Sequence, residues 1–350
     1  LNRSYVFASA PNFSEAANKV IKGLEDNGYS KADFVGASDA ENYSDPLEAK
    51  KAIKKDLKVP MMAFEKEKLS FEDLVGEDFE LAKQNADFDF KIHYDLDGQA
   101  TIDITEDDEW LQSKQLSLPY QYLDGEHSVD ELVVWLDKKL RFPMVSPEDK
   151  VEFIEKAVQT QIKKSKRSLP ELSVNRYLFA DRLGIVITDI LETYTKKVFT
   201  DLLAKKKLVV KPFDSYPATI SLKSPAPHVF NKNLYERVDA VNGEESGFMR
   251  RIDLGALDNV DFWVRNREKV DPFYIQGWKK GKFYPDFVAV TKKGNIVALE
   301  WKGEDRLDNP DTLYKTEIAK QWVKLGKGKL HFYLVHNGKV DEVLSELKNL

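Results

Sequence analysis

The sequence predicts an α/β protein of the α+β kind, in which helices and strands dominate different parts of the chain. Two observations support this fold class. Apolar residues recur with helical spacing through the middle of the chain, and short apolar or alternating segments typical of strands stand on either side of it. With 350 residues, 42% of them hydrophobic, the chain is longer than one ordinary domain and has enough apolar residues for two or three cores.

The first region, residues 1–110, is predicted to contain both strands and helices. Residues 4–8 read as a strand, and the pattern after them indicates a helix that ends at Gly28. Alternating apolar residues on both sides of a turn predict a hairpin over 88–104. Because the chain begins with Leu1 rather than methionine, we expect it to be a fragment of a longer protein.

The second region, residues 111–225, is predicted to be mainly helical. Helices are expected over 129–140 and 147–164, and the second begins with a serine and a proline, which favour a helix start. A longer helical pattern runs over 169–207, and Gly184 is a candidate interruption of it. The residues of this region do not indicate its role.

The last region, residues 226–350, is predicted to be a separate domain. Two short strand-like segments between 208 and 222 precede it, and two closely spaced prolines mark the boundary. A helix that contains Glu245, with apolar residues three and seven positions further on, is expected first. A strand over 260–265 is expected to follow it.

Polar residues flank the apolar stretch 287–299 of this last region. Asp286 stands directly before it, and Glu300 and Lys302 stand directly after it. Because strand residues alternate between faces, Glu300 and Lys302 are expected to point to one side and Trp301 to the other. One face of a predicted strand therefore carries a carboxylate and an amine.

The loop inside this stretch decides where Asp286 lies. Residues 291–295 read as a hairpin turn with a three-residue loop and Gly294 in the left-handed bulge position, which places Asp286 opposite Glu300. A two-residue loop would instead pair Asp286 with Trp301 and put the two carboxylates on opposite faces. We expect the three-residue loop.

Two carboxylates and a lysine that converge at the end of a strand suit phosphodiester hydrolysis. Carboxylate oxygens hold Mg²⁺, Mn²⁺ accepts the same ligands, and either metal neutralises phosphate charge and lowers the pKa of a bound water. A lysine can orient that water or stabilise the developing charge. Asp286 and Glu300 are therefore candidate metal ligands, and Lys302 is a candidate catalytic residue. The alternative is a solvated hairpin whose charges are unrelated.

The spacing Glu-x-Lys is weak evidence by itself, because it occurs twice more in the chain. Glu48-Ala49-Lys50 lies in the segment 46–57, which is expected to be a helix. Glu148-Asp149-Lys150 lies in the first turn of the helix expected over 147–164. We therefore favour the strand-borne pair Glu300 and Lys302.

Two further side chains are candidates for the same site. Glu245 is a candidate second acid, although Glu244 beside it is an alternative and either could be a solvated residue at a helix start. Lys315 shares one helical face with Ala319 and Trp322, so it either approaches the site or remains a surface lysine.

Basic residues make the last region a candidate for contact with nucleic acid. The chain has a net charge of -6, but the residues from 226 onward contain 21 lysines and arginines against 19 aspartates and glutamates, a net of +2, which leaves -8 for 1–225. Basic residues beside aromatic ones can bind phosphates and stack on bases, although such clusters are often solvated hairpin edges. The candidates for DNA contact are Arg265, Arg267, Lys279, Lys280, Lys282 and Lys315.

The composition excludes several other classes of protein. Without cysteine, the chain has no disulfide, thiolate zinc site or iron–sulfur cluster. No apolar run approaches the length of a membrane span, and no signal peptide opens the chain, so we expect a cytoplasmic protein without membrane association. No G-x-x-x-x-G-K-[ST] loop occurs, so no ATP site is expected.

These motifs resemble the C-terminal nuclease domain of type III restriction enzyme helicase-nuclease subunits, a member of the PD-(D/E)xK superfamily. The resemblance covers about a third of the chain. The opening residues are loosely similar to the segment that follows the second RecA-like helicase domain of the same subunits. The residues that carry the resemblance are Glu245 with Phe248, 260–266, 284–287, 300–303, and Lys315 with Trp322.

The resemblance implies a restriction-endonuclease-like domain, with a central mixed sheet flanked by helices, that cleaves double-stranded DNA with Mg²⁺. Asp286 and Glu300 would bind the metal, Lys302 would assist the reaction, and Glu245 would match an upstream helical acid. A methyltransferase partner that reads the DNA sequence, and an ATP-driven motor missing from this chain, are also implied. Two alternatives stay open: a DNA-binding or assembly platform of the same fold without activity, and an exonuclease or nickase of a repair-type helicase-nuclease.

Overall fold

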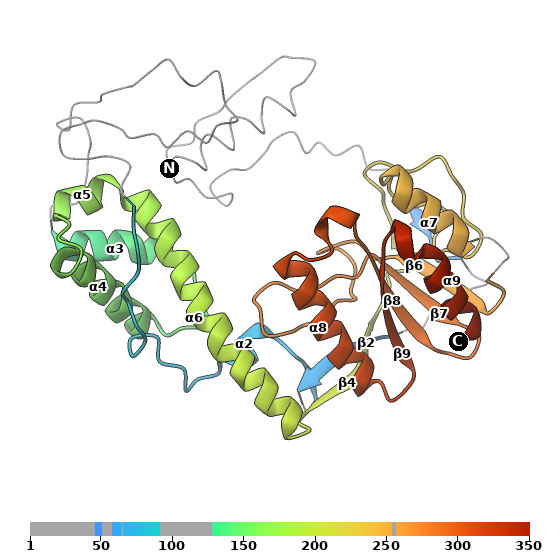
Figure 1. Ribbon diagram of the computed structural model, residues 1–350, viewed down its shortest axis with the longest axis horizontal. Coiled ribbons are helices and arrows are strands. Elements are labelled where there is room, and N and C mark those ends of the chain that lie inside the picture. Colours follow the sequence, from blue (N-terminus) through green and yellow to red (C-terminus); the bar gives the residue numbers. More distant parts are fainter. Residues whose placement is uncertain (1–45, 51–57, 65, 92–127, 254–256) are drawn as a thin grey trace, which may run out of the picture. The chain divides into compact units, whose positions relative to one another are not determined.

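The computed structural model describes residues 46–50, 58–64, 66–91, 128–253 and 257–350 (Figure 1). These residues form two compact units: the first lies within 75–191, and the second combines 46–74 with 192–350. Both helices and sheets are present, as the expected α+β class requires. The expected division into 1–110, 111–225 and 226–350 stays a prediction.

Several expected elements lie outside the described residues. They are the strand over 4–8, the helix ending at Gly28 and most of the 88–104 hairpin. The described start of that hairpin, 88–91, forms no strand. The rings of Phe88 and Phe90 instead pack against Phe179, with centroid distances of 5.8 and 5.1 Å. The alternation of aromatic residues therefore reflects packing against a helix.

The first unit is helical, as predicted. Serines at positions 128, 146 and 168 cap the first three helices by accepting hydrogen bonds from backbone N–H groups of the first turn. The helices expected over 129–140 and 147–164 are confirmed within one residue at each end. The helices are α3 (Val129–Lys139), α4 (Pro147–Lys163), α5 (Leu169–Val174) and α6 (Arg176–Ala204), the last of which ends in the second unit.

The long helical pattern is interrupted at Asn175 and not at Gly184. Asn175 leaves helical geometry, with φ -96° and ψ 17°, and its side-chain amide donates to the carbonyl of Glu171 at 2.8 Å. Gly184 stays inside α6, where a Cβ atom would lie 3.4 Å from Leu140. The prediction was wrong because the asparagine satisfies a helix end, whereas the glycine allows close packing.

The second unit contains the sheets of the described part of the chain. The largest is mixed, with strand order β6-β7-β8-β9, and only its β8–β9 pair is parallel. The strands are β1 (Leu47–Glu48), β2 (Lys58–Phe64), β3 (Glu67–Lys68), β4 (Leu208–Ser215), β5 (Thr219–Ile220), β6 (Val260–Arg265), β7 (Phe287–Thr291), β8 (Ile296–Trp301) and β9 (Leu330–Val335). The remaining helices are α2 (Phe71–Val75), α7 (Gly243–Asp253), η3 (Glu304–Arg306), α8 (Pro310–Leu325), η4 (Asn337–Lys339) and α9 (Val340–Asn349).

Helices cover both faces of the mixed sheet (Figure 1). On one face α8 places Ile318 and Trp322 against Val288 and Ala298 of the central strands. On the other face, α7 and α9 pack on the side chains that alternate with these, and Phe248 lies 5.8 Å from Phe287 between ring centroids. A central mixed sheet flanked by helices is therefore confirmed, as are the helix that holds Glu245 and the strand over 260–265.

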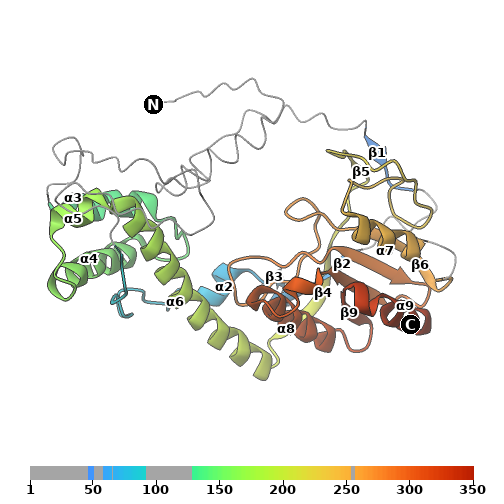
Figure 2. The same cartoon turned by 45° about the horizontal axis from the view of Figure 1, so that its top comes forward.

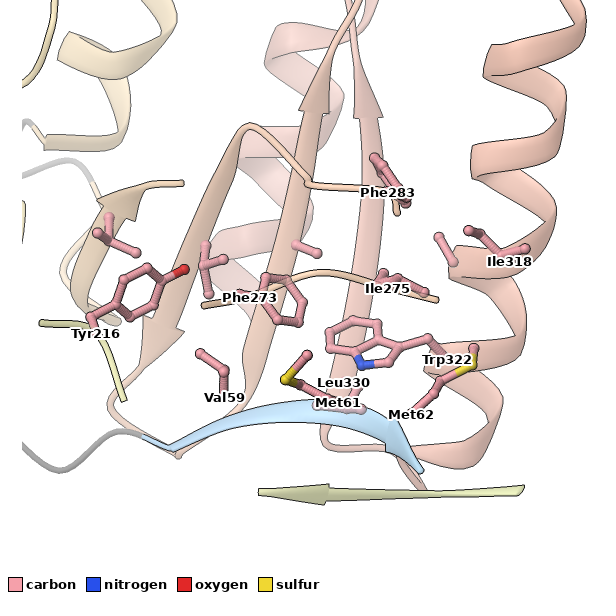
Figure 3. Packing of buried hydrophobic residues seen from close by; sticks show 14 of the residues in the cluster. Val59, Met61, Met62, Tyr216, Phe273, Ile275, Phe283, Ile318, Trp322 and Leu330 are labelled. Atoms are coloured by element: carbon pink, nitrogen blue, oxygen red, sulfur yellow. The ribbon is translucent and has the colours of Figure 1, made fainter. Parts of the chain in front are cut away.

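The face under α8 is completed by residues from early in the chain. Strand β2 pairs with β4, and Met61 and Met62 of β2 lie beside the Trp322 indole (Figure 3). The Trp322 indole N–H donates to the carbonyl of Pro60 at 2.7 Å. The core of the last region therefore includes a strand, β2, whose residues fall within the expected first region 1–110.

The helix expected over 46–57 is wrong where the structure describes it. Leu47 and Glu48 form β1, which pairs with β5 (Figure 2). The Ala49 N–H donates to the carbonyl of Ala218 at 2.7 Å. A partner strand distant in sequence has overridden the local helical pattern.

Candidate active site

The hairpin of β7 and β8 has the register expected from its loop. The paired residues run from Val290 opposite Ile296 to Phe287 opposite Leu299, and Gly294 has φ 78°. The loop therefore has three residues, and the prediction is confirmed. Continued by one residue, this register sets Asp286 opposite Glu300.

Backbone bonds hold these two residues at the end of the sheet. The Trp301 N–H donates to Asp286 Oδ2 at 2.7 Å, so the carboxylate is bound to the strand that carries Glu300. The Lys302 N–H donates to the carbonyl of Val335 at 2.9 Å, which extends the pairing of β8 with β9 past Glu300. Asp286, Glu300 and Lys302 are thus brought together, as the alternation of strand residues predicted.

Glu300 is the most unusual carboxylate of this cluster, because its side chain is only 4% exposed. Its Oε1 forms ion pairs with Lys302 Nζ at 2.8 Å and with Lys315 Nζ at 3.8 Å. Its Oε2 is buried and has no hydrogen-bond partner among the described residues. Burial and the nearby charge of Asp286 raise the pKa of Glu300 to about 8, although the two lysines act in the opposite direction.

Lys315 comes to the site from α8, one of the two placements that the sequence left open. Besides Glu300 it contacts Asp311 Oδ2 at 2.8 Å, one helical turn earlier. Burial lowers the pKa of Lys315, but the hydrogen bond to Asp311 and the charge of Glu300 outweigh it, so the pKa is raised overall. Sequence reasoning did not identify Asp311 as a partner of Lys315, although a position four residues earlier on a helix indicates such a pair.

Glu245 and not Glu244 faces the cluster. Arg265 Nη2 lies 2.8 Å from Glu245 Oε1, an ion pair without hydrogen-bond geometry, and Arg265 Nη1 lies 3.0 Å from Asp286 Oδ1. Glu244 is exposed and accepts a hydrogen bond from Asn337 at 2.6 Å. Burial raises the pKa of Glu245, Arg265 opposes this shift, and Asp286 adds to it.

The residues predicted to contact DNA fall into three groups. Arg265 and Arg267 are both held by carboxylates within the protein, Arg267 by Asp271 at 2.8 Å. Of the lysines, Lys315 lies on α8 within the acid cluster, and the other three belong to a short loop closed by the bridge between Ile275 and Phe283. Contact of any of them with DNA stays a prediction. The loop lysines are Lys279 over the Tyr314 ring at 4.9 Å, exposed Lys280, and exposed Lys282 over the Tyr274 ring at 4.3 Å.

The residues at this site fit a divalent metal bound through two carboxylates. Within the described residues no three acidic or histidine side chains converge as a ligand group. Mg²⁺ does not need such a group, because it commonly binds one or two carboxylates and completes its shell with water and phosphate oxygens. The unpartnered Oε2 of Glu300, opposite Asp286, is a suitable donor atom.

The chain was compared with protein-family models, curated proteins and solved structures, and none of the three comparisons finds a match. Function is therefore inferred from the geometry of the site. In the part of the chain that the structure describes, no helix has the length and apolar character needed to cross a membrane.

Proposed function

We propose that this chain is a metal-dependent deoxyribonuclease that hydrolyses phosphodiester bonds in double-stranded DNA. The observation that carries the proposal is the buried Glu300, whose Oε2 has no partner among the described residues and which lies beside Lys302 and opposite Asp286. A protein seldom leaves a buried carboxylate oxygen unsatisfied unless a ligand or ion compensates for it. Such a site suits a divalent cation and an anionic substrate.

Each residue of the cluster has a role in the proposed reaction. Asp286 and Glu300 would hold Mg²⁺ or Mn²⁺, which supplies a positive charge beside the scissile phosphate and lowers the pKa of a bound water. Lys302 presents its ammonium group beside Glu300, where it can stabilise charge that develops on phosphate oxygens. Lys315 supplies a second positive charge on the same side, and Glu245 acts as a further acid of the site.

The proposed class is the PD-(D/E)xK nucleases, and the mixed sheet between helices with acids at the end of a hairpin supports it. Within that class we propose the nuclease part of a type III restriction helicase subunit, on the motifs around Glu245, Asp286 and Glu300. Such a protein would be cytoplasmic and would work with a methyltransferase partner and an ATP-driven motor outside this chain. Cleavage by the isolated chain would then be weak.

One observation favours a second candidate, a DNA-binding platform without activity. Both oxygens of Asp286 already have partners, Arg265 on one side and the Trp301 N–H on the other. A metal would have to share these oxygens. An inactive platform would bind DNA without metal and release no products.

A gel assay separates these functions. The chain and its Asp286→Ala variant are incubated with supercoiled and linear DNA in Mg²⁺ or Mn²⁺, and nicked, linear and degraded products are scored. Asp258→Ala is a matched control, because Asp258 is an exposed acid in the turn before β6. We expect cleavage by the chain and the control and none by Asp286→Ala.

The other outcomes are equally informative. Degradation that requires free DNA ends would indicate an exonuclease, and nicking without linear product would indicate a nickase. Cleavage by Asp286→Ala at the rate of the unaltered chain would place the activity elsewhere. DNA binding without cleavage, also in the presence of the motor and the methyltransferase partner, would leave the platform.

A further inference from the structure

Arg265 contacts both Glu245 and Asp286 of the candidate site. It stands at the end of β6, with its side chain 20% exposed and its guanidinium 4.9 Å from the centre of the Phe287 ring. Its Nη2 pairs with Glu245, and its Nη1 donates to both the carbonyl, at 2.6 Å, and Oδ1 of Asp286, at 3.0 Å. Arg265 therefore lies between the two acids.

This arrangement depends on the shape of the arginine side chain. A guanidinium has a rigid, planar fork with two separate terminal nitrogens, so it can bind two carboxylates in fixed directions, whereas the point charge of a lysine cannot. With the Trp301 N–H bound to its other oxygen, the Asp286 carboxylate is held from both sides. Its orientation is set before any ligand binds.

The same contacts keep Glu245 apart from the other acids. Glu245 Oε1 faces the guanidinium at 2.8 Å, and the described acids do not form a three-ligand group. Arg265 would therefore compensate most of the negative charge of Glu245 near a metal held by Asp286 and Glu300. Without Arg265, two carboxylates would lose their counter-charge beside the metal.

We propose that Arg265 is a positioning residue that fixes Asp286 for metal binding and prevents Glu245 from acting as a third metal ligand. This inference rests on the proposed metal-dependent nuclease. Removal of the guanidinium increases the affinity of the site for a divalent cation, because the local negative charge rises, and it reduces cleavage, because Asp286 loses its orientation. Removal of a residue that only supports the fold would not raise the affinity of the site for metal.

The first test is Mn²⁺ binding by the whole chain, measured by titration calorimetry without DNA. Arg265→Met should bind Mn²⁺ about tenfold more tightly, since one positive charge near the metal is lost. Arg265→Lys, which keeps the charge, should stay within about threefold of the unaltered chain. Arg251→Met is the matched control, because Arg251 pairs with Asp341 at the surface of α7, and it should change nothing.

A double variant assigns the gain to Glu245. In the Arg265→Met background, Glu245→Gln removes the uncompensated charge and should return Mn²⁺ affinity to within about threefold of the unaltered chain. Arg265→Gln, which retains amide donors for the Asp286 carbonyl, replaces Arg265→Met if that variant does not fold. Unchanged or weaker Mn²⁺ binding by the neutral variants, or no Mn²⁺ binding by any of the proteins, overturns the inference.

Cleavage assays on the same proteins separate this inference from the proposed function. We expect Arg265→Met to lower kcat at least about tenfold despite its tighter metal binding, and Arg265→Lys to recover part of the loss. Cleavage by the unaltered chain, with no gain in metal affinity for Arg265→Met, would retain the nuclease and reject the role of Arg265. A gain in metal affinity without cleavage by any protein, also in the presence of the motor and the methyltransferase partner, would retain that role and reject the nuclease.

Discussion

Asp271 and Glu300 are both buried acids of the second compact unit, and each lies beside a basic side chain. Asp271 accepts hydrogen bonds on both of its oxygens: Oδ2 from the backbone and Nε of Arg267, and Oδ1 from Nη2. Buried Asp253 is similar, with backbone N–H groups on both oxygens and the indole of Trp263 on one of them. Glu300 has two lysines on one oxygen and no hydrogen-bond partner among the described residues on the other.

The difference separates carboxylates that support the fold from one that is suited to a ligand. A buried carboxylate is stable when hydrogen bonds replace its lost hydration, as they do for Asp271 and Asp253. Glu300 retains an unsatisfied oxygen and a raised pKa, both of which reduce stability. Such a departure from the pattern within one compact unit is typical of a functional site.

Removal of Asp271 should have the largest effect on stability. Asp271→Ala leaves the half-buried Arg267 guanidinium without its carboxylate, and the free energy of unfolding should fall by about 3–5 kcal/mol. Urea unfolding followed by circular dichroism measures it, with Asp258→Ala as an exposed control that should stay within about 0.5 kcal/mol. A loss below about 1 kcal/mol would remove the structural side of the contrast with Glu300.

Replacement of Glu300 should instead remove a pH dependence. The pKa of Glu300 is raised from 4.5 to about 8, so between these values the folded state holds a proton that the unfolded state has released. Its contribution to stability is therefore complete below about pH 4.5, falls as the pH rises, and levels off above about pH 8, with a slope near 1 kcal/mol per pH unit.

The measurement is urea unfolding in the presence of a chelator, across this pH window, for the chain and for Glu300→Gln. Subtraction of the two curves removes the other titrating groups. The unaltered chain should lose stability relative to Glu300→Gln as the pH rises. A difference that is flat, or that increases with pH, would mean that Glu300 is satisfied like Asp271.

The two lysines on Glu300 should differ in their effect on cleavage. Lys302 Nζ lies 2.8 Å from Glu300 Oε1 and Lys315 Nζ lies 3.8 Å from it, where Asp311 shares its charge. We expect Lys302→Ala to lower kcat about 100-fold and Lys315→Ala about tenfold. Lys324→Ala, at an exposed position of the same helix as Lys315, is the control. Equal losses for the two site lysines would contradict the assigned roles.

Sequence reasoning succeeded where the structure depends on short segments. The hairpin register follows from the loop around Gly294, and the convergence of Glu300 with Lys302 follows from strand alternation. The helices that carry Glu245 and Lys315 follow from apolar spacing. Each of these signals lies within about twenty residues of the side chain it positions.

Two features that sequence reasoning missed depend on contacts between distant segments. Leu47 and Glu48 form a strand because β5, far along the chain, offers a partner, and no pattern near them reveals it. The pairing of Arg265 with Glu245 and Asp286 was missed, because it requires the register of β6 against β7. Two strands separated by a long connection have no loop chemistry to fix that register.

The cations show a similar contrast between a charge that is paired within the protein and one that is exposed. The smallest predicted effect, a change in DNA binding, follows from it. Arg267 is held by buried Asp271, whereas Lys282 is exposed on the loop between Ile275 and Phe283, with the Tyr274 ring beneath it. If DNA approaches the end of the sheet that holds Glu300, Lys282→Ala should weaken DNA binding severalfold. The slope of log affinity against log salt concentration should fall by about 0.9 for one lost phosphate contact.

Lys293→Ala provides the matched control, because Lys293 is an exposed lysine in the hairpin loop at the opposite end of β7 and β8. Fluorescence anisotropy with a short duplex, in Ca²⁺ to prevent cleavage, measures both affinities over a range of salt concentrations. Replacement of a lysine outside the interface should change neither the affinity nor the slope. A slope change for Lys293→Ala as large as that for Lys282→Ala would mean that DNA does not distinguish the two ends of the sheet. That result would argue against a nuclease site at the end that holds Glu300.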